Sequence, residues 1–315
     1  MKDVSVVIPC FNARDSIREA LGSVASQNLA LGEVIVVDDG SVDESAEIIA
    51  REFDWVRLVR TPNRGPSAAR NLGTAMATGK FIQYLDADDL LAPGKLQTQI
   101  AALENARAGV AYGDWQKLIP SHAGAFQPGP VISRKIEGPP ELALFTDFWC
   151  PPAAYLFRRE IVEKVSWNRG LPVIQDARFA LDCALYGARF VHTPGIAAYY
   201  RVHKSGSVSS RDSLAFVRDC LKNAIEVERL WTLHGGITPE RRKALLQVYA
   251  YPARASFEND RPTFDTACAA LERLKPGYAP EAPRHLAIVS RLAGYRRAES
   301  LALAYRKAKR LVQFS

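Results

Sequence analysis

The chain of 315 residues is long enough for one large domain with a smaller appendage, or for two domains. Its composition, 48% hydrophobic and 24% charged, is that of an ordinary soluble globular protein, and no apolar run is long enough to span a bilayer. Residues 1–3 lead directly into a predicted strand rather than a signal peptide, and the five cysteines lack C-x-x-C spacing. We therefore expect a cytoplasmic protein without a disulfide framework or a zinc site.

The net charge of +7 is unevenly distributed along the chain. Residues 211–315 carry 19 Lys and Arg against 11 Asp and Glu, a net charge of +8, which leaves −1 for residues 1–210. This asymmetry indicates a partner for the last third alone: an anionic membrane surface, an acidic polymer or another chain.

The first half of the chain alternates between predicted strands and predicted helices. Residues 4–9 and 33–37 are β-branched runs typical of buried strands, and strands are also predicted at 56–59, 81–85 and 110–112. Three helices are predicted: one over 17–27, one that begins at a capping box formed by Ser41 and Glu44, and one over 67–77. This order predicts a doubly wound, mostly parallel sheet with a ligand crevice at the carboxyl ends of its strands.

Three carboxylates, those of Asp86, Asp88 and Asp89, follow the strand at 81–85. Alternation along an extended chain points Asp86 and Asp88 to the same side, where their oxygens can converge on one object. Carboxylates this close repel each other unless a cation lies between them, and hard divalent cations prefer oxygen ligands. The alternative for a bare Asp-x-Asp is a solvated acidic turn.

The segments that follow the predicted strands are rich in acidic residues and poor in glycine. A dinucleotide-binding fold would place G-x-G-x-x-G after the first strand, but residues 9–14 read PCFNAR, and a P-loop is absent as well. We therefore expect a nucleotide-type fold in which a metal at Asp86 and Asp88, rather than a glycine loop, holds a pyrophosphate.

Four segments together resemble a known family. VSVVIPCFN at 4–12, VVDDGS at 36–41, NRGPSAARNLG at 63–73 and YLDADD at 84–89 are similar to the nucleotide-sugar-binding half of family 2 glycosyltransferases, which have the GT-A fold. Each segment alone is a weak signal, but the four in this order and spacing are a strong one. The resemblance covers roughly residues 3–210 and implies an enzyme that uses a nucleotide-sugar donor.

The resemblance also implies roles for individual residues on the donor side. Pro9, Phe11 and Asn12 would line the base and ribose, one of Asp38 and Asp39 would accept a hydrogen bond from the base, and Arg70 would lie near the base or the diphosphate. Asp88 would be the main ligand of a Mn²⁺ or Mg²⁺ ion, with Asp86 helping through ribose or water. A different interpretation of Asp38 is a charge partner for a helix N-terminus.

Regular alternation stops near residue 115. Residues 117–140 contain five prolines and predict a loop or an irregular strand, a strand is predicted at 154–157, and a helix follows Asp176. The family places its general base on an aspartate in a motif usually written Glu-Asp, and this chain has Gln175-Asp176. We therefore predict Asp176 as the base, with Asp114 and Asp147 as the next candidates; the alternative is a plain helix cap.

A last segment of the resemblance is Tyr200-Arg201-Val202-His203, which is similar to a family segment, Tyr-Arg-x-His-x-x-Ser, that closes over the diphosphate. His203 is thereby implied as a further contact of the metal or of a phosphate. The remaining histidines show no ligand spacing, and we assign them no role.

Helices are predicted over 213–233, 238–255, 263–274 and 295–312, and no family resemblance covers this part of the chain. The last helix is strongly basic and has a single acid, Glu299. It could lie in the plane of a membrane surface or pack on the catalytic domain with a solvated basic face.

These observations predict a GT-A domain over 1–210, with donor binding in 1–115 and the acceptor side in 116–210, followed by a helical basic region over 211–315. We expect a metal-dependent inverting glycosyltransferase that moves a sugar, preferentially from a UDP-sugar, to a hydroxyl of a glycan or lipid-linked saccharide, without a nucleic-acid partner. The alternatives are a nucleotidyltransferase and a non-catalytic nucleotide- or carbohydrate-binding subunit.

Overall fold

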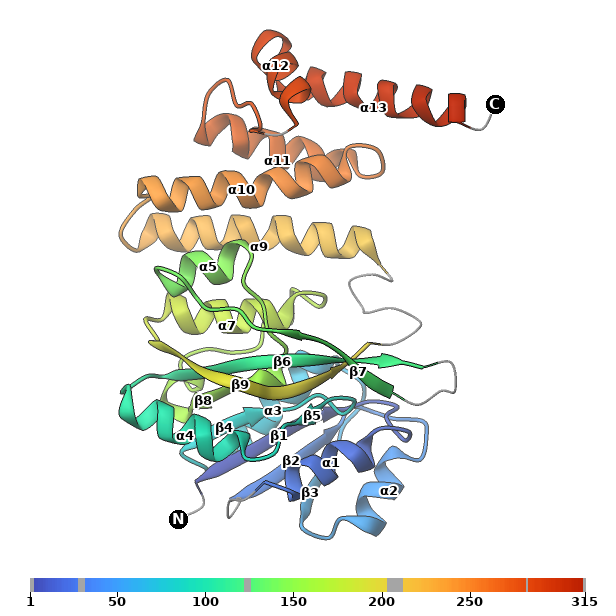
Figure 1. Cartoon of the computed structure of the whole chain (residues 1–315), viewed down its shortest axis with the longest axis vertical. Coiled ribbons are helices and arrows are strands. Elements are labelled where there is room, and N and C mark those ends of the chain that lie inside the picture. The colour runs from blue at the N-terminus through green and yellow to red at the C-terminus, as the bar shows by residue number, and fades with distance from the viewer. Residues whose placement is uncertain (1–2, 28–31, 122–125, 203–211, 282, 314–315) are drawn as a thin grey trace. The chain divides into compact units, whose positions relative to one another are not determined.

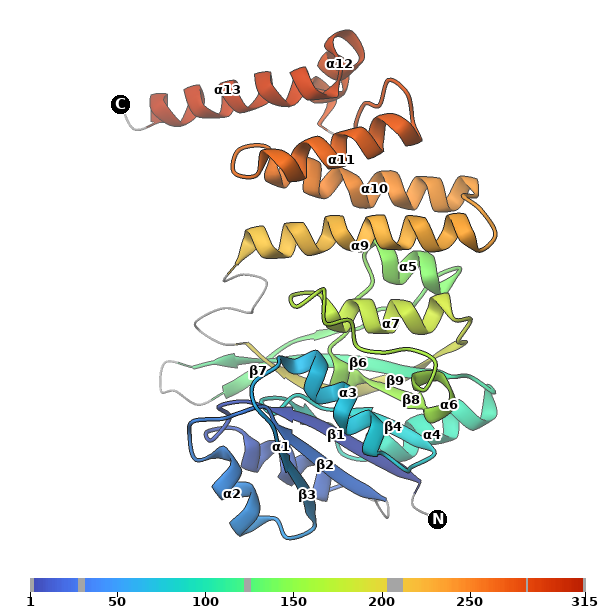
Figure 2. The ribbon, with the colours of Figure 1, turned by 180° about the vertical axis from the view of Figure 1, so that it is seen from behind.

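The computed structural model describes residues 3–27, 32–121, 126–202, 212–281 and 283–313, the last nine of these as backbone only. The chain divides into two compact units, Met1–Ser207 and Val208–Ser315. Figures 1 and 2 show the first unit as a sheet covered by helices and the second as a stack of helices.

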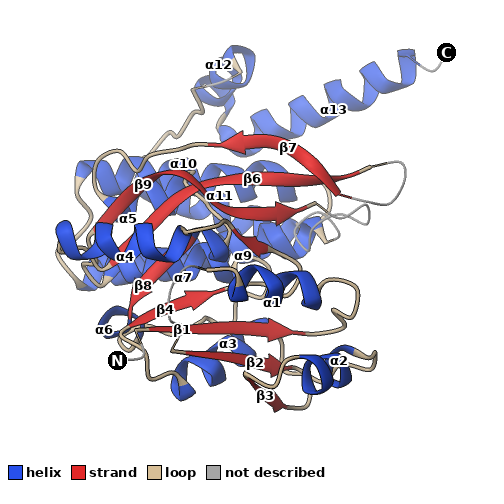
Figure 3. Ribbon diagram, turned by 60° about the horizontal axis from the view of Figure 1, so that its bottom comes forward, coloured by secondary structure: helices blue, strands red, loops and turns tan. Residues whose placement is uncertain are grey.

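Within the described residues, nine strands of the first unit form one sheet with the order β3-β2-β1-β4-β8-β6-β9-β5, and β7 pairs with β6. Its first half is parallel throughout and consists of β1 (Val4–Cys10), β2 (Glu33–Asp38), β3 (Val56–Arg60) and β4 (Phe81–Tyr84). Figure 3 shows these four arrows pointing the same way, so their carboxyl ends meet at one edge of the sheet. The β-branched residues predicted to be buried are the core here.

The second half of the sheet is mixed. It consists of β5 (Leu90–Leu91), β6 (Val110–Pro120), β7 (Phe126–Ile132), β8 (Tyr155–Arg158) and β9 (Phe190–Arg201), of which only β6 and β9 pair in parallel among the described strands. The strand predicted at 110–112 is longer than expected and continues to Pro120. It pairs with β7 with a register shift between Gln116 and Leu118, so an irregular strand, one of the two alternatives for 117–140, is present there. The sequence did not predict β9.

The helices of the first unit cover both faces of the sheet, as a doubly wound fold requires: α1 and α4 lie on one face and α3 on the other (Figures 1 and 2). In the part of this unit that the structure describes, the helices are α1 (Ile17–Ala25), α2 (Ser45–Glu52), α3 (Pro66–Met76), α4 (Lys95–Asn105), α5 (Pro140–Thr146), α6 (Arg159–Val162) and α7 (Gln175–Leu185), with a 3₁₀ turn at Pro152–Ala154. The predicted capping box is wrong: α2 begins at Ser45, and the hydroxyl of Ser41 instead accepts a hydrogen bond from the Asn12 N–H.

The second unit contains, in its described part, α9 (Ser213–Leu233), α10 (Pro239–Ser256), α11 (Arg261–Leu274), α12 (Arg284–Ala293) and α13 (Tyr295–Gln313). The side chains of Asp212, Thr238 and Asp260 cap the first three helices by accepting hydrogen bonds from backbone N–H groups. The four predicted helices are present, and α12 is an additional one. None of the helices that the structure describes is both long enough and apolar enough to cross a membrane.

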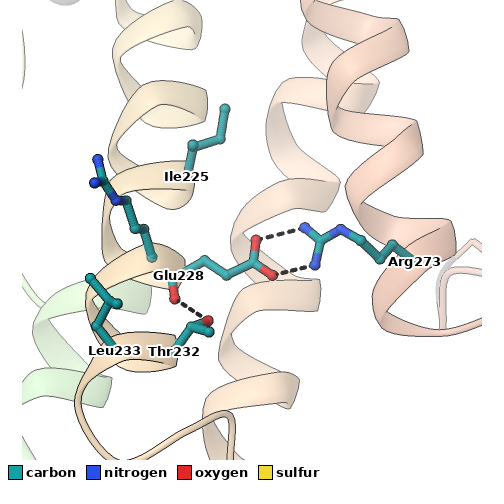
Figure 4. A pocket seen from close by; sticks show the side chains of 6 residues that line it. Ile225, Glu228, Thr232, Leu233 and Arg273 are labelled. Atoms are coloured by element: carbon teal, nitrogen blue, oxygen red, sulfur yellow. Dashed lines mark hydrogen bonds and ion pairs between the residues drawn. The ribbon is translucent and has the colours of Figure 1, made fainter.

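An ion pair between a buried carboxylate, that of Glu228, and the largely exposed guanidinium of Arg273 joins α9 to α11 in this unit (Figure 4). Glu228 accepts two hydrogen bonds from the Arg273 guanidinium, at 2.6 and 2.8 Å, and one from the Tyr249 hydroxyl at 2.7 Å. Burial alone would raise the pKa of Glu228, but these hydrogen bonds lower it below its usual range. Beside this pair lies a pocket of about 290 Å³ whose lining residues all belong to α9 and α11: Ile225, Glu228, Arg229, Thr232, Leu233 and Arg273.

Replacing Glu228 by glutamine is expected to lower the free energy of unfolding of the helical unit by about 1–3 kcal/mol, because a neutral amide cannot match the charged, three-donor environment. The folded-state pKa of Glu228 is lowered, so its stabilisation is present at neutral pH and is lost as the pH falls through that pKa. Urea unfolding at neutral and acidic pH measures both effects, with the exposed Glu281→Gln as the matched control. A loss of stability that stayed the same at acidic pH would contradict this account.

Candidate active site

The loops after β1 and β2 hold each other through backbone-to-side-chain hydrogen bonds. The Asn12 and Ala13 N–H groups donate to the hydroxyls of Ser41 and Ser45 (2.9 and 2.8 Å), and the Asn12 side-chain oxygen accepts from the Val42 N–H at 2.9 Å. Asn12 has a left-handed backbone with φ of 50°, a conformation that asparagine tolerates. The ring of Phe11 is 49% exposed at the tip of this fixed loop.

Asp38 and Asp39 are both buried, and both carboxylates contact the protein itself. Asp38 accepts hydrogen bonds from the Ser41 N–H (3.2 Å) and the Arg60 guanidinium (3.1 Å). Asp39 accepts from the N–H groups of Arg64 and Gly65 (2.9 and 2.8 Å) and thereby fixes the turn that enters α3. Each carboxylate has about four acceptor positions, so these bonds leave capacity for a further donor.

Arg70 connects three separate segments of the first unit. It lies on α3, is only 2% exposed, and donates one hydrogen bond to Asp86 at the end of β4 and another to the Gln175 side-chain oxygen (2.7 Å) at the start of α7. Its guanidinium also lies 4.3 Å above the ring of Trp167. Gln175, which stands where the family usually has an acid, therefore accepts from Arg70 as a carboxylate would, but without a charge.

The three acids after β4 have different environments. Asp89 is 1% exposed and accepts a hydrogen bond from the Arg201 N–H (2.9 Å), so it ties this segment to β9, while Asp86 and Asp88 are partly exposed. Burial, followed by the charges of Asp88 and Asp86, raises the pKa of Asp89 well above its usual range. The negative charges of Asp88 and Asp86 thus act on the buried Asp89 carboxyl group beside them.

The donor set suits a hard divalent cation that is shared with a substrate. In the described residues no three His, Cys, Asp or Glu side chains gather into a metal cage. Mg²⁺ in phosphate-binding sites commonly takes only one or two protein carboxylates and completes its shell with phosphate oxygens and water. Asp86 and Asp88 supply such oxygens beside Asp89, whose buried Oδ2 has no hydrogen-bond partner among the described residues. His203 lies outside the described residues.

Asp176 lies in the first turn of α7, one residue after Gln175 and two after the N-cap residue Ile174. Its Oδ2 accepts a hydrogen bond from the indole N–H of Trp149 at 2.8 Å. Burial raises the pKa of Asp176, the bond from Trp149 and the charge of Arg70 act against this, and the pKa remains above its usual range. A carboxylate whose pKa is raised toward neutrality is a better proton acceptor.

Trp149, which binds this carboxylate, belongs to an aromatic cluster that was not predicted. The ring of Trp149 meets those of Trp115 and Tyr200 edge-on at centroid distances of 5.3 and 5.7 Å, and Trp115 and Tyr200 are 5.6 Å apart. Burial, followed by the nearby carboxylates of Asp89 and Asp176, raises the pKa of Tyr200. The sequence could not predict this cluster, because Trp115 and Tyr200 are far apart along the chain and come together only through the pairing of β6 with β9.

The two other candidate bases have environments that suit the role less well. Asp114 accepts one hydrogen bond from the Gly195 N–H (3.1 Å), and its other carboxylate oxygen forms a hydrogen bond with the His192 ring (2.9 Å). Burial raises the pKa of Asp114, but these hydrogen bonds lower it by more, so the pKa lies below its usual range. Asp147 forms a surface ion pair with Arg134 at 2.9 Å and is 64% exposed.

Replacing Trp149 by phenylalanine is expected to move the acidic limb of the pH profile of kcat/KM upward by on the order of one pH unit. The indole N–H stabilises the charged form of Asp176, so its loss raises the pKa, and the base stays protonated to a higher pH. Trp115→Phe is the control, since it alters the same cluster but leaves this hydrogen bond in place. Equal shifts in both variants would indicate a general packing effect.

Residues 5–165, just over half of the chain, match the family described as Glycosyl transferase family 2. The chain is 41% identical over 106 residues to the uncharacterised glycosyltransferase YibD of Escherichia coli. The matched region covers 32% of this chain and 31% of YibD. It is 27% identical over 228 residues to the E. coli enzyme WfaP, a UDP-Glc:alpha-D-GlcNAc-diphosphoundecaprenol beta-1,3-glucosyltransferase, covering 69% and 84% of the two chains. In YibD and three other uncharacterised bacterial glycosyltransferases that resemble this chain, the matched region spans only 19–46% of the relative's own length.

Two solved structures have a similar fold. Residues 1–349 of TarS from S. aureus match 97% of this chain and 92% of that one, with a TM-score of 0.65 and 18% identity. The mannosyltransferase PcManGT of Pyrobaculum calidifontis, solved with GDP-Man and Mn²⁺, matches 95% and 82%, with a TM-score of 0.54 and 21% identity. The fold predicted from the sequence is thereby confirmed, and the chain belongs to glycosyl transferase family 2.

Proposed function

We propose that the chain is an inverting, metal-dependent glycosyltransferase that moves a sugar from a UDP-sugar to a hydroxyl of a lipid-linked saccharide or another glycan. One observation carries the proposal. Arg70 binds Asp86 of the acidic segment and Gln175, the neighbour of Asp176, so one buried cation links the proposed diphosphate site to the helix that carries the proposed base.

The donor is assigned to residues 1–115. Phe11 offers an exposed ring on a loop fixed through Asn12, beside Pro9, and Asp38 or Asp39 supplies an acceptor for a base N–H. TarS has been solved with UDP-GlcNAc and with UDP, and PcManGT with GDP-Man, so relatives of this fold bind both nucleotides. WfaP is a UDP-glucose enzyme, which favours UDP here.

Asp86 and Asp88 would hold the divalent cation, Asp88 as the main ligand. When bound, such an ion neutralises the charge that develops on a diphosphate leaving group. Arg70 keeps the Asp86 carboxylate oriented, and Asp89 anchors the segment to β9. His203 remains a proposed further contact of metal or phosphate.

Asp176 is proposed to take the proton of the acceptor hydroxyl while the hydroxyl oxygen bonds to the anomeric carbon. The bond from that carbon to the diphosphate oxygen breaks in the same displacement, and the nucleoside diphosphate leaves with the electron pair. A single displacement inverts the anomeric configuration, and no enzyme nucleophile is needed. The Trp149 N–H fixes the carboxylate in position for this transfer.

The acceptor side is assigned to residues 116–210. Trp149 and Tyr200 are partly exposed and provide apolar ring surface of the kind that packs against sugar rings, and the buried Trp115 packs against both of them. The acceptor of WfaP is linked to diphosphoundecaprenol, which supports a lipid-linked saccharide here as well.

A thermal-shift panel of UDP-, GDP- and dTDP-sugars with and without Mn²⁺ tests the donor and the metal. Hydrolysis of the stabilising nucleotide sugar by the purified protein then tests catalysis. A nucleotidyltransferase would release pyrophosphate instead, and a binding subunit would be stabilised by ligand without turnover. Stabilisation by no nucleotide sugar, with or without metal, would overturn the proposal.

A further inference from the structure

The positive charge of the helical unit is concentrated in α12 and α13. From residue 284 to the end, the sequence holds eight Lys and Arg and a single acid, Glu299. Glu299 is fully buried and accepts a hydrogen bond from the Tyr295 hydroxyl at 3.0 Å. The described surface of these two helices therefore has cations on it and no acidic side chain from the helices themselves.

One face of α12 combines cations with exposed aliphatic side chains. Ile288 is 55% exposed and Leu292 is 83% exposed, and they are spaced four residues apart. Arg284 and Arg291 are also exposed and lie on the same face, at i, i+4, i+7 and i+8 spacing with the aliphatic pair. The opposite face packs within the unit through Leu286, Ala287 and Ser290.

The same pattern continues beyond Gly294 into the first turns of α13. Leu301 is 58% exposed, and Arg297 is exposed as well. Arg296, by contrast, is paired with Asp265 of α11 at 2.8 Å and helps hold α13 on the unit. The sequence offered the helix at 295–312 as a membrane-surface helix or as a packed helix with a solvated basic face, and the structure adds α12 as a second element with exposed aliphatic side chains.

We propose that the exposed face of α12 docks in the plane of an anionic lipid surface. Ile288 and Leu292 would enter the boundary between headgroups and acyl chains, where burial of aliphatic area is favourable. Arg284 and Arg291 flank them and would bind headgroup phosphates while their apolar stems lie along the lipid. An acidic polymer would match the charge alone and leave the two aliphatic side chains in water.

The test uses the full chain and needs no turnover, and none of the residues involved belongs to the candidate active site. Flotation with phosphatidylcholine–phosphatidylglycerol vesicles should recover the protein at low salt, less so at high salt, and pure phosphatidylcholine should recover little. The double variant I288S/L292S should lower partitioning by about tenfold or more, and R284Q/R291Q by about fivefold for each arginine. The matched control is I225S/L233S, which removes equivalent aliphatic side chains that are 44% and 65% exposed on α9.

Three results would overturn the proposal. Wild-type protein that floats equally with neutral vesicles would remove the role of the cations. Loss of binding in R284Q/R291Q but not in I288S/L292S would indicate a polyanion rather than a bilayer as the partner. Light scattering that shows a dimer in the wild type and a monomer in I288S/L292S would assign the face to a second copy of the chain.

Discussion

Replacing Asp176 by asparagine is expected to lower kcat by about 10²–10⁴-fold while the affinity for the donor stays close to that of the wild type. Asparagine keeps the shape of the side chain, and its amide oxygen can still accept the hydrogen bond from Trp149. It cannot accept the proton of the acceptor hydroxyl, so the loss is confined to the transition state. Single-turnover kinetics and donor titration by calorimetry measure the two quantities separately.

The controls for this variant follow from the structure. Asp54→Asn makes the same chemical change at an exposed position and should leave turnover unchanged. Asp114→Asn removes the rival carboxylate that binds His192 and should have a much smaller effect than Asp176→Asn. Near-normal turnover of Asp176→Asn, or a product that retains the donor's anomeric configuration by NMR, would show that the assignment is wrong.

The parallel half of the fold could be predicted from the sequence because its signals are local. The β-branched runs of β1 and β2 are buried along their length, and the acids after β4 stand where a parallel sheet opens to ligands. The helix predicted at 238–255 is also close to the observed α10, because Thr238 followed by Pro239 marks its start locally. In each case the deciding interaction lies within a few residues along the chain.

The remainder could not be predicted because its determinants are distant in sequence. β9 contains Pro194 and Gly195, which indicate a turn, but a register shift against β6 near Gly113 accommodates them within a continuous strand. Ser41 resembles a helix cap, yet its hydroxyl accepts the N–H of Asn12, 29 residues earlier. Within the site, the contacts of Arg70 with Gln175 and of Trp149 with Asp176 likewise depend on tertiary structure.

Replacing Asp88 by alanine is expected to abolish the Mn²⁺-dependent part of UDP binding. Removing one partner of a charge pair in a partly buried site costs about 3–5 kcal/mol, which corresponds to a loss of more than about 10²-fold in affinity. Asp88 is a better choice than Asp86, because the Asp86 carboxylate also holds Arg70 and its removal would disturb α3 and α7. Calorimetric titration of UDP with Mn²⁺ and with EDTA measures the metal-dependent part directly.

The three adjacent carboxylates give this variant a second, independent readout. Asp88→Ala removes one of the charges that raise the pKa of Asp89, and the melting temperature of each protein in EDTA is the reference for its own metal response. With Mn²⁺ and UDP present, the wild type should gain stability by mass action and the variant should not. Asp54→Ala should behave as the wild type in both conditions. A variant that keeps Mn²⁺-enhanced UDP affinity, or gains the same stability from Mn²⁺ and UDP, would move the metal site away from Asp88.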